Sequence, residues 1–199
     1  MRAVAKKSYH HGNLQAELIE AGLALIAEKG VRALTLREIG AKVGVSRTAA
    51  YRHFADKASL LAAIRAAGFE KFAAALEAGR AVSTKDFKAR LLGMGLAYVR
   101  FAREHSAYFE VMFNTSSQEE CAAEQYAFQI LEETIIEGQT KGILRPGNPH
   151  LMSCALWSLV HGISALKLED MPFAAGLTPN DFVTACSGLL LTGIQTTKK

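Results

Sequence analysis

The fold of this 199-residue chain is decided by Thr35-Leu-Arg-Glu-Ile-Gly-Ala-Lys-Val-Gly-Val-Ser-Arg-Thr-Ala-Ala-Tyr-Arg-His-Phe54. Thr35 and Glu38 have the spacing of a capping box, which starts a helix. Gly44 suits the left-handed conformation that ends a helix, and Ser46 is a favourable N-cap for the next one. The stretch therefore predicts two short helices joined by a tight turn, which is a helix-turn-helix. The second helix carries basic, hydroxyl and aromatic side chains, as does a helix that lies in the major groove of DNA.

The same segment resembles the DNA-binding region of the TetR (tetracycline repressor) family of bacterial transcription regulators. The resemblance covers about the first third of the chain, and the residues that carry it are Thr35-Leu-Arg-Glu-Ile39, Gly44-Val-Ser46, Tyr51-Arg-His-Phe54, Asp56-Lys57 and Leu60-Leu61. Thr48 stands where many members have glycine, and Ala50 stands where a larger aliphatic residue is common. Because both lie in the second helix of the motif, no base preference can be carried over from a relative.

Side chains of this motif divide into two groups by what they are expected to contact. Arg47 suits a guanine edge, and the methyl groups of Thr48 and Ala49 suit a thymine methyl. Contacts to phosphates, which fix register, are expected from Thr35, Ser46, Tyr51, His53 and Lys57; for Tyr51 and His53 this role is implied by the resemblance. Arg37 is a further DNA-binding candidate, although groove contact and simple solvation are equally good interpretations of both Arg37 and Lys42.

The charge distribution agrees with a DNA-binding N-terminal segment. Residues 1–57 contain ten Lys/Arg and five Asp/Glu, a net charge of +5, and the remainder contains thirteen and fourteen, a net charge of −1. A basic excess confined to one end of a chain is expected when that end approaches a polyanion.

The rest of the sequence predicts an all-α protein of about nine helices, with no convincing strand. We expect a three-helix DNA-binding domain over residues 1–57 and a larger helical effector-binding and dimerisation bundle over residues 58–199. The first helix is predicted from Asn13 to Lys29, with Leu25 on its inner stripe. The later helices are predicted over residues 56–79, 86–104, 107–113, 119–141, 149–168 and 178–196, with starts at Asp56 and at Asn148-Pro149 set by capping residues.

The last two long helices predict a homodimer. Leu151–Leu166 and Phe182–Ile194 are apolar on nearly all faces, whereas a surface helix of a monomer shows a polar side. We expect each subunit to contribute both helices to a four-helix interface around a two-fold axis. The alternative is that these helices are central in a monomer. Within them, Trp157-Ser-Leu-Val-His161-Gly162 resembles the Trp…His-Gly signature of one TetR subfamily's C-terminal domain.

Aromatic and methionine side chains in the middle of the chain predict an effector pocket. Phe87, Leu91, Met94, Tyr98, Phe101 and His105 recur at steps of four and three, so they share one helical face. Such a stripe is usually core, but TetR-like bodies typically enclose a small-molecule pocket among these helices. The resemblance thus implies a mostly apolar effector, with the candidate ligand-binding residues Met94, Tyr98, Phe101, His105, Phe109, Met112, Tyr126, Trp157 and His161.

These features predict a sequence-specific DNA-binding transcriptional regulator. Its default mechanism is a dimeric repressor on a palindromic operator that a small effector releases; an activator or a co-repressor-dependent form stays open. The alternative is a helical interaction protein of the same fold that does not bind DNA. An enzyme is not expected, because Ser164-Ala-Leu-Lys167 lacks the companion motifs of S-x-x-K enzymes and no P-loop or H-E-x-x-H occurs.

Three cysteines far apart, Cys121, Cys154 and Cys186, suit a reducing compartment better than a disulfide framework or a zinc site. No cofactor, metal site or membrane partner is expected. The N-terminus lacks the apolar run of a signal peptide, so we expect a bacterial cytoplasmic protein that is nucleoid-associated when bound to DNA.

Overall fold

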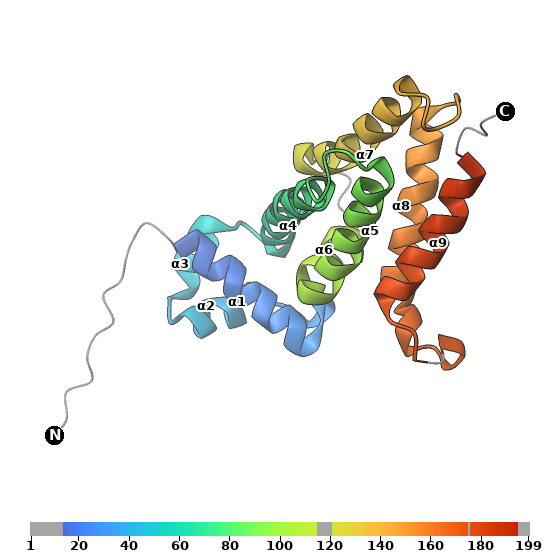
Figure 1. Ribbon diagram of the computed structural model, residues 1–199. Coiled ribbons are helices and arrows are strands. Elements are labelled where there is room, and N and C mark those ends of the chain that lie inside the picture. Colours follow the sequence, from blue (N-terminus) through green and yellow to red (C-terminus); the bar gives the residue numbers. More distant parts are fainter. Residues whose placement is uncertain (1–13, 115–120, 175, 195–199) are drawn as a thin grey trace.

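The computed structural model describes residues 14–114, 121–174 and 176–194, and these form nine α-helices and no β-strand (Figure 1). The all-α prediction is therefore confirmed. Three short 3₁₀ helices, Val31–Ala33, Leu168–Asp170 and Pro172–Ala174, lie between them. The α-helices are α1 (Leu14–Lys29), α2 (Leu36–Val43), α3 (Arg47–His53), α4 (Lys57–Arg80), α5 (Phe87–Glu104), α6 (Ser106–Asn114), α7 (Ala122–Thr140), α8 (Pro149–Leu166) and α9 (Pro179–Ile194).

Local capping signals start and end the helices of the N-terminal unit, which we call the head (α1 to α3). The hydroxyl of Thr35 accepts a hydrogen bond from the Glu38 amide, and Gly44 ends α2 at a left-handed φ of 83°. Ser46 caps α3 by accepting from the Ala49 amide. The second hydrogen bond of the predicted Thr35–Glu38 capping box, from the Thr35 amide to the Glu38 carboxylate, is replaced by other contacts. The Glu38 carboxylate accepts from the Thr35 hydroxyl and from Lys29 instead, because α1 brings that ammonium group within reach.

A small-residue contact sets how closely α2 and α3 approach. Ala50 is fully buried in α3, and a Cβ placed on Gly40 of α2 would lie 3.4 Å from the Ala50 Cβ. A side chain on Gly40 would therefore press against Ala50, so the two small residues face one another across the α2–α3 contact. The departure noted in the sequence is thus matched by the tight approach of these two helices.

Helix α4 belongs to both the head and the larger C-terminal bundle, which we call the body (Figure 1). It begins beside α3, where Asp56 and Ser59 form a complete capping box, and it packs on α5, α6 and α7. Near its end the backbones of α4 and α5 touch, since a Cβ on Gly79 would lie 2.5 Å from the Gly93 carbonyl oxygen. Farther back along α4, an ion pair joins Arg65 to Glu124 of α7. Helix α4 therefore packs along the body and also contacts the head.

Several helix ends differ from the prediction. Helix α8 stops at Leu166, because Lys167 adopts a left-handed φ of 47° and turns the chain into a 3₁₀ helix. The inner face of α1 is formed by Leu18 and Ile26, whereas Leu25 is only partly buried. Asn13, Glu119 and Thr196, predicted to start or end helices, lie outside the described residues.

Among the described helices, none has the length and hydropathy needed to cross a bilayer.

Candidate DNA-binding surface and ligand cavity

The outer face of α3 collects the side chains that the sequence assigns to DNA. Arg47, Thr48, Tyr51 and His53 are exposed, and Ala49 is half-buried. The opposite face is fixed in the head core through Ala50, so the direction of the exposed face is set by packing.

A cation–π contact organises the first turns of this face. The Arg47 guanidinium carbon lies 5.3 Å from the centroid of the Tyr51 ring, one helical turn away. Tyr51 keeps 41% of its surface exposed although it is a large aromatic residue. A guanidinium on an exposed ring has five donors free for a planar acceptor, which is what a guanine edge or a phosphate offers.

The neighbouring basic side chains of the head differ in how they are held. Lys57 Nζ donates to the Arg32 carbonyl at 3.0 Å, which ties the start of α4 to the turn after α1. Lys42 forms an ion pair with Glu28 at 2.8 Å, and Arg37 is exposed. The pairing of Lys42 favours a role in holding α2 against α1, a contact that sequence reasoning did not foresee.

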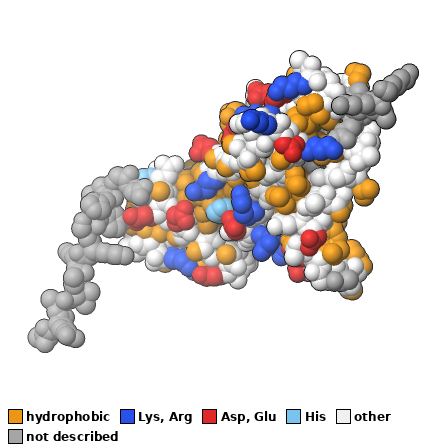
Figure 2. Space-filling model, viewed as in Figure 1, with side chains coloured by type: hydrophobic (Ala, Val, Ile, Leu, Met, Phe, Trp, Pro, Cys, Tyr) orange, Lys and Arg blue, Asp and Glu red, His pale blue; other side chains and the backbone are white. Residues whose placement is uncertain are grey.

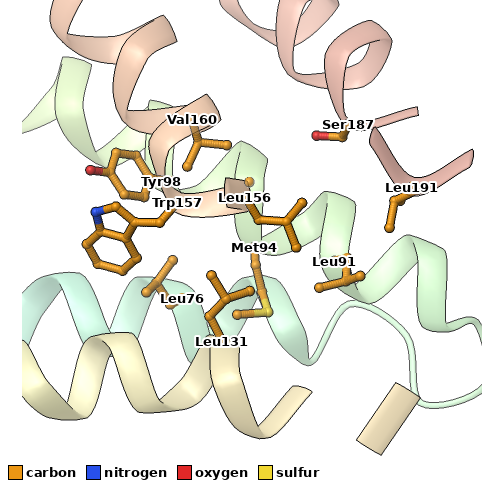
Figure 3. Close-up of a pocket in the computed structure, with 11 residues that line it drawn as sticks. Leu76, Leu91, Met94, Tyr98, Leu131, Leu156, Trp157, Val160, Ser187 and Leu191 are labelled. Carbon is orange, nitrogen blue, oxygen red and sulfur yellow. The ribbon is translucent and has the colours of Figure 1, made fainter. Parts of the chain in front are cut away.

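The body contains a small apolar cavity of about 40 Å³ (Figure 3). Its wall comes from five helices, and its lining residues are Leu76, Leu91, Met94, Gly95, Tyr98, Leu131, Leu156, Trp157, Val160, Ser187 and Leu191. Ligand sites for drug-sized molecules usually measure about 300–1,000 Å³, so an effector must widen this cavity to enter it. Met94 suits such a change, because its unbranched side chain adapts to varied shapes.

The polar end of the cavity is built around Tyr98. This side chain is only 1% exposed, and its ring meets Phe72 and Trp157 edge-on with centroids 4.9 and 5.4 Å apart. Its hydroxyl lies 2.8 Å from Nδ1 of His161. Burial raises the pKa of Tyr98 above its usual value and lowers the pKa of His161. Both groups are therefore neutral at pH 7, and they form an uncharged hydrogen-bonded pair.

Three of the nine ligand-binding candidates, Met94, Tyr98 and Trp157, line the cavity together. Phe109 and His161 instead line a neighbouring cleft, with their rings stacked at a centroid distance of 5.6 Å.

The remaining four candidates lie elsewhere. Phe101 is buried against Phe72, and Met112 packs under Gly68 of α4. His105 is exposed at the end of α5, and Tyr126 is 49% exposed. The Tyr126 hydroxyl donates to Glu77 at 3.3 Å. Sequence reasoning missed the aliphatic lining of α4, α8 and α9, since nothing distinguishes a cavity-lining leucine from any other core leucine.

The three cysteines are free thiols and each is partly buried. Within the described residues no cluster of three or more His, Cys, Asp or Glu side chains is placed to hold a metal ion. The described parts of the molecule thus offer a surface for a polyanion and a cavity for an apolar molecule.

Helices α8 and α9 leave one apolar face uncovered. They lie side by side at the edge of the body opposite the head, and orange and white atoms dominate that edge (Figures 1 and 2). Leu151, Leu166 and Leu189 are 65%, 57% and 78% exposed. A Cβ placed on Gly162 or Gly188 would meet nothing within 4 Å. Across both helices, Asp181 is the only charged residue.

Comparison with known proteins agrees with this geometry. A sequence model described as bacterial regulatory proteins, tetR family, matches residues 18–64, and one described as tetracyclin repressor-like, C-terminal domain, matches residues 91–186. No curated protein sequence matches the chain.

Solved structures resemble the whole chain. A protein of unknown function from Rhodococcus sp. RHA1 is 28% identical, with a TM-score of 0.85 over 96% of this chain and 100% of its own. A bacterial regulatory protein in the tetR family from Rhodococcus RHA1 is 25% identical, with a TM-score of 0.72 over 92% of this chain and 98% of its own. The TetR family regulator PfmR from Thermus thermophilus shares the fold at 22% identity and a TM-score of 0.70, covering 90% of this chain and 99% of its own. The head with its helix-turn-helix, the body behind it and the two sequence models together show that this chain belongs to the TetR family of bacterial transcription regulators.

Proposed function

We propose that this protein is a repressor that binds a palindromic operator as a homodimer and is released by a small, mostly apolar effector. The observation that carries the proposal is the outer face of α3, where Arg47, Thr48 and Tyr51 are exposed on a helix anchored from behind by buried Ala50. We place the boundary between the DNA-binding domain (1–57) and the effector domain (58–199) at the start of α4. Such a regulator works in the bacterial cytoplasm, on the nucleoid when it is bound to DNA.

The roles proposed for individual side chains follow from their positions on the head. Arg47, Thr48 and Ala49 occupy the first turn of α3, which is the part of a recognition helix that reaches base edges. Phosphate contacts are assigned to residues around the rim of that helix: Thr35, Ser46, Tyr51, His53 and Lys57. Arg37, exposed on α2, completes the proposed surface.

The uncovered face of α8 and α9 supports a homodimer. Large exposed leucines beside glycines with open space in front of them form a surface onto which a second helix pair can pack closely. A two-fold axis through this face presents two α3 helices to DNA, and two recognition helices read half-sites about 34–36 Å apart or a multiple of that spacing.

Effector release is proposed to act through α4. A ligand shifts a conformational equilibrium only by its differential affinity for the two states. Leu76 of α4 lines the cavity, and α4 begins in the head at Lys57. A molecule that widens the cavity therefore presses on the helix that positions α3. The state with a widened cavity is proposed to hold the two heads at a separation that does not match the operator.

The proposal is tested with fluorescence anisotropy on the intergenic DNA upstream of the protein's own gene. The double variant Tyr51→Ala, Lys57→Ala should weaken binding. The loss of Lys57 should also make the dependence on salt shallower, because log K falls by about 0.9 per neutralised phosphate per decade of salt. The matched control is Lys88→Ala, which removes an exposed lysine at the start of α5 on the body. Unchanged binding by the double variant favours instead a helical interaction protein that does not use this face for DNA.

A further inference from the structure

A cleft at the junction of head and body lies directly behind the polar end of the cavity. This junction cleft measures about 360 Å³ and is bounded by α1, α5, α6 and α8, with Ile26, Phe109, Glu110, His161 and Lys167 among its lining residues. It is distinct from the cavity, because the two share no lining residue.

One hydrogen-bonded pair separates the two spaces. Tyr98 lines the cavity, His161 lines the junction cleft, and their bonded atoms are 2.8 Å apart. The hydroxyl of Tyr98 and the indole nitrogen of Trp157 both point away from Leu191, at the end of the cavity nearest this partition (Figure 3). A residue that lines the cavity is thus bonded directly to a residue that lines the cleft, and polar atoms gather at this partition.

We propose that the cavity and the junction cleft are two ends of one ligand channel, closed here by the Tyr98–His161 pair and occupied by a narrow aliphatic chain that ends in an uncharged oxygen acceptor such as a ketone. This inference rests on the proposed function, because it specifies the chemical class of the effector that binds in the body. The aliphatic chain enters the cavity between Met94, Leu131 and Leu191. Its oxygen replaces one partner of the opened pair, and the alkyl group on the other side of the carbonyl points into the cleft.

The charges around the channel favour a neutral ligand. The cavity lining contains no charged side chain. In the cleft, the carboxylate of Glu110 and the ammonium of Lys167 balance each other. His161 faces Phe109 and Phe113 with ring centroids 5.6 and 4.8 Å away, so aromatic rings surround the hydrogen-bonded pair on the cleft side. An ionised head group would lose hydration there without gaining an unopposed partner of opposite charge.

The cleft also gives the ligand a direct contact with the head. Glu110 of α6 accepts a hydrogen bond from the Val31 amide at 3.1 Å, in the turn that follows α1. Ile26 of α1 lines the same cleft. A molecule that fills the cleft therefore touches both α1 of the head and α6 of the body. This contact adds to the displacement of α4 that a ligand in the cavity would cause.

Trp157 provides a direct readout, because it is the only tryptophan in the chain and it lines the cavity. Titration of the full-length protein with 2-undecanone should change its fluorescence saturably. Shorter methyl ketones, down to 2-hexanone, should bind more weakly by about fourfold per methylene removed. Undecanoate, of equal length but charged, should bind more weakly than 2-undecanone, because its carboxylate loses hydration without gaining a partner of opposite charge.

Two variants test the partition. Tyr98→Phe and His161→Phe each keep a ring but remove a polar partner. A ketone oxygen only accepts a hydrogen bond, so the variant that removes its donor should weaken 2-undecanone binding roughly three- to tenfold, whereas the variant that removes the displaced partner should not weaken it. His150→Phe is the matched control, because that exposed imidazole lies 3.3 Å from the Glu132 carboxylate and lines neither space, and it should leave the affinity unchanged.

Three results would overturn the inference: no fluorescence change with any ketone of the series, equal affinity of wild type and both partition variants, or tighter binding of undecanoate. Anisotropy with operator DNA, measured in parallel, separates this from the proposed function. DNA binding without ketone binding contradicts only the channel, whereas ketone binding by a protein that binds no DNA contradicts only the repressor.

Discussion

Replacing Arg47 by alanine removes the side chain that we expect to read a guanine. A bidentate arginine–guanine contact is worth about 1–3 kcal/mol of discrimination. In the free protein the guanidinium carbon of Arg47 lies 5.3 Å from the centroid of the Tyr51 ring. An exposed cation–π contact of this kind is worth about 0.5–1 kcal/mol. If that contact is given up on binding, the net gain is about 0.5–2 kcal/mol for each half-site. The proposed dimer has two half-sites, so Arg47→Ala should cost about 1–4 kcal/mol, or roughly 5-fold to 700-fold in affinity for the operator.

The assay is fluorescence anisotropy at fixed salt, with the operator and with an unrelated duplex of equal length. The variant should lose affinity for the operator while its affinity for the unrelated duplex changes far less. Lys88→Ala again serves as the control for loss of one positive charge. An equal loss on both duplexes would show that Arg47 contacts phosphate, and no loss on either would refute the assignment of α3 as the recognition helix.

Three further predictions concern the body. Gly79→Ala should lower the free energy of unfolding by about 1–3 kcal/mol in urea titrations, because its Cβ meets the backbone of α5 at 2.5 Å. The control Ala78→Ser, at the exposed neighbouring position in α4, should change stability by less than about 1 kcal/mol. Glu137 has its pKa lowered to about 2 by Arg90 and Lys141, so its stabilisation is complete above the ordinary carboxyl pKa near 4.5 and is lost as the pH falls towards 2. Glu137→Gln should therefore flatten the decline in stability between pH 5 and pH 2, by only about 1 kcal/mol because the side chain is 31% exposed, and an unchanged acid profile would contradict this. Leu189→Glu should convert the proposed dimer to a monomer in sedimentation velocity, while Val82→Glu, on a similarly exposed residue outside the face, should not. A dimer that survives Leu189→Glu would place the interface elsewhere.

Residues close in sequence made the head predictable. Thr35, Gly44 and Ser46 act on backbone groups within three or four residues, so their effect does not depend on the rest of the fold. The start of α8 at Asn148 and Pro149 follows the same logic. The inner face of α1 was less well predicted, because Leu25 and Ile26 are equally apolar and only the packing of α1 on its neighbours decided which of them is buried.

The amino-acid sequence by itself determined the helix-turn-helix, the basic head and the all-helical body, since capping, periodicity and charge are local or additive properties. Only the tertiary structure decided that Tyr98 meets His161 across 63 positions, that five helices leave a cavity between them, and that Tyr126 faces outward. Those outcomes depend on the angle and depth at which the helices pack. Contacts between different helices, such as the close approach of Gly79 to Gly93, set both.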